Sequence, residues 1–110
     1  MDYLDRTMLH GNAETLVLAV LADRPCHGYE IRKELATRSN EHFQFAFGRL
    51  YPLLQSLERR RLVTTRQTKS ALHRDCKQYA LTAAGANALR TRKTRWRQFV
   101  AAMDQVLART

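Results

Sequence analysis

The sequence predicts a mainly α-helical fold with one small β-hairpin, and three observations support this expectation. Three segments between residues 12 and 60 carry apolar side chains at helical spacing. Two later segments are β-branched or alternate apolar with polar residues, as half-buried strands do. The last segment repeats apolar residues every seven positions, which is typical of a long helix with a seam. For 110 residues we expect an N-terminal arm (1–11), one compact domain (12–82) and a C-terminal helix (83–110).

The first two helices are expected at residues 12–22 and 27–38. The first is apolar almost all round, which indicates a helix buried on most sides. A strand would fit so short a run by periodicity alone, but Asn12 is a good N-cap and the run is rich in Ala and Leu. In the second segment Ile31 and Leu35 lie four residues apart, so this helix should pack by one side.

A turn at residues 39–42 and an aromatic stretch lead to the third helix. Phe43, Phe45 and Phe47 alternate with other residues. This alternation indicates either an extended approach to the helix or an aromatic cap on the core beneath it.

The third helix, expected at residues 47–60, has two unlike faces. Pro52 is tolerated only near a first turn, which places the start at residue 47 or 48. Leucines at helical spacing form an apolar stripe, made of Leu50, Leu53, Leu54 and Leu57. Polar and cationic residues fall largely elsewhere, namely Arg49, Gln55, Ser56, Arg59 and Arg60, with Glu58 as the acid at helical spacing. Such charge is usually just solvated, but cations without acidic partners favour a polyanion as ligand.

A β-hairpin should follow, with strands at residues 62–68 and 76–82. The first strand is β-branched and the second alternates in polarity. The hairpin gathers five potential cations, which are Arg66, Lys69, His73, Arg74 and Lys77. Their expected role is to neutralise phosphates.

The last helix should run from its N-cap, Thr82, to about residue 108. Its apolar residues form a heptad-like seam, made of Leu89, Trp96, Phe99, Val100, Met103, Val106 and Leu107. We do not expect one small domain to bury the whole seam. The seam therefore predicts a homodimer paired through this helix, with help from the first helix.

Positive charge is concentrated in the second half of the chain. Residues 56–110 hold thirteen Lys and Arg against three Asp and Glu, whereas residues 1–55 hold six against seven. This asymmetry favours nucleic acid as the partner. No apolar run approaches the length that spans a bilayer, and no basic amphipathic helix stands free of a core role. We expect a cytoplasmic protein with no membrane partner.

The sequence contains none of the common motifs for catalysis or cofactor binding. It contains no glycine-rich phosphate loop, no Ser/His/Asp set and no paired carboxylates at active-site spacing. We expect no enzymatic activity, no cofactor and no metal. Cys26 and Cys76 are interpreted as reduced thiols. His27 and His73 lie near them but supply too few ligands for a metal site, so a metal- or thiol-responsive regulator is kept as an alternative.

The order helix, helix, helix, hairpin, helix is that of a winged helix-turn-helix. In that fold the third helix enters the major groove of double-stranded DNA and the hairpin contacts the flanking backbone or minor groove. Arg and Gln side chains can hydrogen-bond base edges. Arg49 and Gln55 are therefore candidates for base reading, with Arg59 beside them. The competing interpretation is an interaction module of the same fold that binds protein, or nucleic acid without sequence preference.

Four short motifs occur in order along the chain. They are His27-Gly28-Tyr29-Glu30-Ile31, then Gly48 with Leu50-Tyr51-Pro52, Leu54, Leu57-Glu58 and Leu62, then Tyr79-Ala80-Leu81-Thr82, and finally Gly85. Together they resemble the PadR-like family of winged-helix transcriptional repressors, over about residues 14–86. The resemblance implies a homodimer that represses from a palindromic operator and is released by an effector. It also implies that Tyr29 and Tyr51 lie near the DNA backbone, although a tyrosine beside leucines often only packs.

Arg61 departs from the family pattern, whereas Trp96 agrees with it. Arg61 replaces the glycine that the family carries after the third helix, so it either bears a left-handed conformation at a cost of about 1 kcal/mol or the helix ends differently. In some short PadR-like proteins, a tryptophan equivalent to Trp96 lines a pocket at the dimer interface and stacks flat ligands. Here the resemblance implies either a site for a small aromatic or hydrophobic effector or plain interface packing.

Overall fold

The computed structural model describes residues 12–69 and 75–110. The described residues form four helices and three strands, in the order α2 (Ala13–Asp23), β1 (Cys26–His27), α3 (Gly28–Arg38), α4 (Phe47–Arg59), β2 (Val63–Lys69), β3 (Asp75–Leu81) and α5 (Ala83–Leu107). The predicted fold class, helical with a small sheet, is confirmed. The predicted N-terminal arm and the tip of the hairpin lie outside the described residues.

The core lies where α2, α3 and α4 meet. Leu18 of α2, Ile31 of α3 and Leu50 of α4 are all fully buried. The leucine stripe of α4 is confirmed, because Leu54 and Leu57 are buried as well and Leu53 packs against the same cluster. Burial of this stripe fixes which face of α4 turns outward.

The aromatic stretch before α4 caps the core. Phe45 is buried and Phe43 packs against the core cluster. The stretch is also non-helical up to Ala46, whose backbone is extended, so both interpretations of the alternating aromatics are confirmed.

The sheet has three strands, where the sequence predicted a two-stranded hairpin. The strand order is β1-β3-β2, and both pairings are antiparallel. β1 pairs Cys26 with Tyr79 and His27 with Gln78. His27 was predicted to begin the second helix, but it lies in β1 and is the N-cap of α3. A strand of two residues has no periodicity to reveal it, since its only signal is the pairing with a strand fifty residues away.

Both α3 and α4 end in a left-handed residue that is not glycine. After α4, Arg61 has φ of 60°, its N–H donates to the Glu58 carbonyl and the Leu62 N–H donates to the Leu57 carbonyl. These two bonds form a Schellman motif, which satisfies the last carbonyls of the helix. Of the two alternatives for Arg61, the left-handed one is the one observed. Asn40 ends α3 with φ of 53°.

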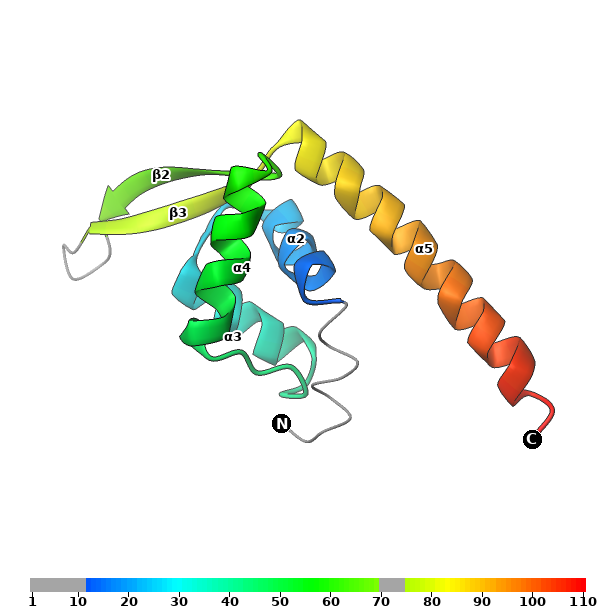
Figure 1. The fold of residues 1–110 in the computed structure, drawn as a ribbon. Helices are drawn as coiled ribbons and strands as arrows, with labels where there is room; N and C mark the ends of the chain where they lie inside the picture. The colour runs from blue at the N-terminus through cyan, green and yellow to red at the C-terminus, as the bar shows by residue number, and fades with distance from the viewer. Residues whose placement is uncertain (1–11, 70–74) are drawn as a thin grey trace.

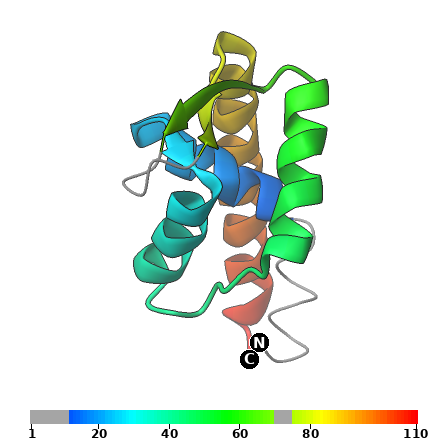
Figure 2. The same ribbon diagram turned by 90° about the vertical axis from the view of Figure 1, so that its left-hand side faces the viewer.

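The hairpin and α5 leave the helical core on opposite sides (Figure 1). Seen from the side, α3 and α4 flank α2, and α5 runs behind them (Figure 2). The principal extents are 57 × 31 × 20 Å, because α5 continues well beyond the core. None of the helices in the described part of the chain is long and apolar enough to cross a membrane.

Candidate nucleic-acid interface

The outward face of α4 carries the side chains that the sequence singled out. Arg49, Gln55 and Arg59 are exposed, and Tyr51 is 49% exposed. The buried leucines fix the rotation of the helix, so Gln55 and Arg59 point outward and Tyr51 and Arg49 lie on its two flanks. Guanidinium, amide and phenol groups on such a surface can donate hydrogen bonds to base edges and phosphates.

The hairpin adds cations next to this helix. Arg66, Lys69 and Lys77 are exposed. The Arg66 Nε donates to the Gln78 Oε1 across the β2–β3 pair at 3.0 Å, which orients its guanidinium along the sheet surface. His73 and Arg74, the other two predicted hairpin cations, lie outside the described residues.

Tyr29, at the start of α3, is 65% exposed. Arg32 lies one turn further along the same helix, with its guanidinium carbon 4.9 Å from the centre of the Phe47 ring. The Phe47 and Tyr51 rings are 6.2 Å apart, so Arg32 adds a cation at the start of α4. Arg32 is not among the predicted site residues, since no spacing pattern in the sequence indicates a contact between these two helices.

The ion pairs of the described residues do not involve the cations of this surface. Glu30 pairs with Arg24, whereas Asp23 and Glu34 both pair with Arg38. Glu58, the acid on α4, accepts a hydrogen bond from the Thr65 hydroxyl at 2.9 Å. No described acidic side chain forms an ion pair with Arg49, Arg59, Arg66 or Lys77. The surface formed by α4 and the hairpin is therefore left with net positive charge.

Arg60 corrects the predicted cationic face. The sequence placed it among the unpaired cations of the third helix, but its Nη2 donates to the Glu14 Oε2 at 2.5 Å. Arg92 of α5 donates to the other Glu14 oxygen at 2.8 Å. Burial alone would raise the pKa of Glu14, but the bonds from Arg60 and Arg92 outweigh it and hold that pKa below its usual value. One carboxylate thus joins α2, the end of α4 and α5.

His27 ties the hairpin to the start of α3. Its Nδ1 lies 2.7 Å from the Glu30 Oε1, and its Nε2 lies 2.5 Å from the Thr68 hydroxyl. The pKa of Glu30 falls to about 2, chiefly because the backbone N–H of His27 donates to it; burial opposes this, while the His27 ring and Arg24 add to it. These contacts set where β2 lies relative to the helices.

The cysteines contribute little to a sensing site in the described part of the chain. Cys26 is buried, and burial raises the pKa of its thiol, which disfavours the reactive thiolate. Cys76 is partly exposed. Among the described side chains, no group of three His, Cys, Asp or Glu comes close enough to hold a metal ion.

The residues of the predicted seam of α5 differ in burial: some are buried or half-buried within the subunit and the others are exposed. Leu89 is 7% exposed within the subunit and belongs to its core, which corrects its place in the seam. Val100 is half-buried. The remaining seam residues are exposed, namely Trp96, Phe99, Met103, Val106 and Leu107. They form an apolar face on the part of α5 that extends beyond the core.

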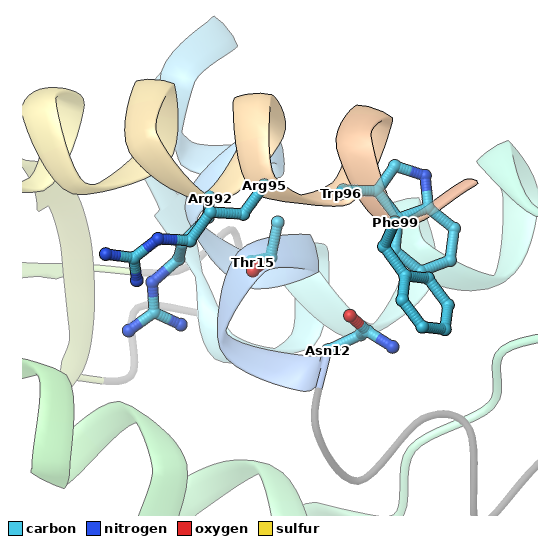
Figure 3. Close-up of a pocket in the computed structure, with 6 residues that line it drawn as sticks. All are labelled: Asn12, Thr15, Arg92, Arg95, Trp96 and Phe99. Atoms are coloured by element: carbon cyan, nitrogen blue, oxygen red, sulfur yellow. The ribbon is translucent and has the colours of Figure 1, made fainter. Parts of the chain in front are cut away.

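A pocket of about 410 Å³ opens between α2 and α5, at the start of this apolar face (Figure 3). Its lining combines two aromatic rings, two guanidinium groups and two small polar side chains, which are Trp96, Phe99, Arg92, Arg95, Asn12 and Thr15. The Trp96 and Phe99 rings are 5.9 Å apart. The two rings could stack against a flat molecule, and the guanidinium groups place positive charge beside them.

The matches to curated relatives cover only part of each relative. A transcriptional regulator from Escherichia coli, YqjI, is 31% identical over 77 residues, which are 70% of this chain and 35% of that protein. Another match, an uncharacterised protein from Lysinibacillus sphaericus, is aligned over 51% of its length. The chain therefore spans about half or less of the curated relatives that it matches.

Solved structures share the fold over most of the chain. A PadR family transcription regulator from Clostridium difficile is 28% identical, with a TM-score of 0.77 over 87% of this chain and 98% of that one. Bacillus subtilis PadR in complex with operator DNA has a TM-score of 0.65 at 23% identity, over 72% of this chain and 45% of that one. The profile of the Transcriptional regulator PadR-like family matches residues 17–91. The chain belongs to this family.

Proposed function

We propose that this protein is a DNA-binding transcriptional regulator that recognises a specific operator sequence. The observation that carries the proposal is the outward side of α4, which presents Arg49, Gln55 and Arg59 next to a cationic hairpin. Neither arginine forms an ion pair with a described acidic side chain. The family match supports it, as does the related fold of Bacillus subtilis PadR with its operator. Residues 12–82 would form the DNA-binding domain, acting in the cytoplasm.

The proposed contacts divide into two kinds. Arg49 and Gln55 would read base edges from α4 in the major groove. Cations around the groove would neutralise phosphates, namely Arg59, Arg66, Lys69, His73, Arg74 and Lys77. The hydroxyl groups of Tyr29 and Tyr51 would donate hydrogen bonds to phosphates. The first kind gives specificity, and the second gives affinity that weakens with salt.

The proposed assembly is a homodimer through α5 and residues 83–110. Its support is the apolar face from Trp96 to Leu107, where five large apolar side chains are exposed within the subunit. Two-fold symmetry would place two copies of α4 on a palindromic operator, with half-sites about one or two helical turns apart. Blocking a promoter in this way would make the protein a repressor.

The pocket beside Trp96 is the proposed effector site, for a small aromatic or hydrophobic molecule. It is supported by the aromatic lining and by its position between α2 and α5. A ligand there would change DNA affinity only as far as it binds the two arrangements of the dimer differently.

The first test is selection from a pool of random duplexes by purified protein near physiological salt, followed by sequencing. We expect enrichment of a palindrome. A pool without enrichment would refute specific recognition and favour the interaction module that binds protein, or nucleic acid of any sequence.

The base-reading role is tested by two variants on the selected operator. Arg49→Ala should cost about 1–3 kcal/mol and relax preference at one operator position. Lys77→Ala is the matched control, since it should weaken all sequences alike and lower the salt slope by about one. Equal losses on every sequence for both variants would contradict base reading by Arg49.

The dimer is tested on α5. Trp96→Asp places a charge on the apolar face and should yield monomers by light scattering. Gln98→Asp, an exposed position on the polar side of the same helix, should stay dimeric. A Trp96→Asp variant that remains a dimer would place the interface elsewhere.

A further inference from the structure

The three glycines in the described part of the chain differ in whether a side chain would fit at their positions. At Gly85, a Cβ would overlap the Leu62 carbonyl oxygen, so packing requires glycine there. At Gly28, a Cβ would make an ordinary contact with the Phe47 ring at 3.9 Å. At Gly48, a Cβ would meet nothing within 4 Å, and the backbone does not adopt a positive φ. Neither packing nor conformation accounts for Gly48.

Gly48 also carries a cost within the subunit. It is the second residue of α4, and glycine has a lower helix propensity than alanine. An alanine methyl at this exposed position would fit without displacing any described atom. The free energy of folding alone therefore favours a side chain here.

The position of Gly48 relates it to the DNA-facing surface. Gly48, Pro52, Gln55 and Arg59 follow one another at intervals of three and four residues, and all four are exposed. They form a single row along the outward face of α4. Gly48 is the member of this row that has no side chain.

We infer that Gly48 is the point of closest approach between α4 and the duplex, where the missing side chain makes room for DNA. Glycine is the residue that lets a main chain come close to a ligand. A methyl group at this point would hold the first turn of α4 away from the groove, so Arg49 and Gln55 would lose reach together. This inference rests on the proposed DNA-binding function and adds a residue that sets how deeply the helix docks.

The test is Gly48→Ala, with Gly48→Ser as a second variant, measured on the operator selected by the wild-type protein. Because alanine favours the helix, the unfolding midpoint should stay equal or rise by about 2–5 °C. The dissociation constant for the operator should rise by at least about fivefold, as expected when a close-packed contact is overfilled. Thr94→Ala is the control, since it also improves a helix position, but on the polar side of α5.

The outcomes separate the inference from the proposed function. A stable Gly48→Ala variant that binds weakly, beside a Thr94→Ala variant that binds like wild type, supports the close approach. Unchanged operator affinity of both Gly48 variants overturns it, as do equal losses in Gly48→Ala and Thr94→Ala. Loss of folding in both Gly48 variants also overturns it, because the space around the missing side chain would then be needed by the fold. A wild-type protein that selects no duplex would instead refute the proposed function itself.

Discussion

Replacing Glu14 by glutamine should loosen the junction between α2, α4 and α5. The carboxylate accepts from Arg60 at 2.5 Å and from Arg92 at 2.8 Å. Glutamine keeps the shape of the side chain and one accepting oxygen, but it removes the charge that both guanidinium groups face. The variant therefore changes the electrostatics of the junction while leaving its packing in place.

The size of the effect follows from the exposure of the partners. Hydrogen bonds to charged groups contribute about 1.5–3 kcal/mol when buried, and exposed ion pairs contribute about 0–1 kcal/mol. The Glu14 and Arg92 side chains are 29% and 28% exposed, and Arg60 is 43% exposed. Solvent screens the Arg60 pair more strongly, so the two pairs together should be worth about 1–2 kcal/mol of unfolding free energy.

The stabilisation by the Glu14 carboxylate should depend on pH. The pKa of Glu14 in the folded protein lies below its value in the unfolded chain. The stabilisation is thus fully present above the unfolded pKa and is lost as the pH falls through the folded pKa. The free-energy difference between wild type and Glu14→Gln should be largest near pH 7 and shrink in acid.

The assay is urea unfolding of both proteins at several pH values and one fixed protein concentration. Asp104→Asn is the matched control, because it removes one negative charge from an exposed position of α5 that forms no ion pair with the described residues. A Glu14→Gln variant as stable as wild type at pH 7 would refute the reasoning, and so would a difference that persists unchanged in strong acid.

Two further variants test the frame around the candidate interface. Glu30→Gln should lower the free energy of unfolding by about 1 kcal/mol at pH 7, because it weakens the hydrogen bond from the His27 N–H. This difference from wild type should disappear as the pH falls from about 4.5 towards 2, where wild-type Glu30 also becomes neutral. A loss that is equal at both ends of that range would contradict the pKa assignment. Gly85→Ala should lower the unfolding free energy by about 2–3 kcal/mol, since its Cβ meets the Leu62 carbonyl, and a variant with wild-type urea stability would show that this contact relaxes freely.

The regular parts of the interface could be predicted because their signals are local. The spacing of Leu50, Leu54 and Leu57 and the position of Pro52 place α4, and α4 spans Phe47–Arg59 in the structure. Thr82 accepts a hydrogen bond from the Gly85 N–H, as expected of the N-cap of α5. Each of these features depends on residues within one or two helical turns.

The contacts that the sequence did not predict join distant residues. Glu14 and Arg60 are 46 residues apart, and Glu14 and Arg92 are 78 apart. No periodicity links such positions, so Arg60 was placed on the free face of α4. The strand β1 was missed for the same reason, because two residues form a strand only through their distant partners.

The seam of α5 shows why a pattern predicts a face but not what covers it. The seven-residue repeat continues from Leu89 through Trp96 to Met103, although residues 90–95 are all polar. At about 1.5 Å per residue, α5 with its 25 residues is roughly 37 Å long, whereas α2 with 11 residues offers roughly 16 Å. Only the first part of α5 can therefore pack on α2, and Leu89 lies there. Trp96 and Phe99 still line the pocket beside the start of α2, but from Met103 onward the apolar face extends past its own domain. This mismatch in length, rather than the heptad spacing, favours a second copy of the chain as the partner of that face.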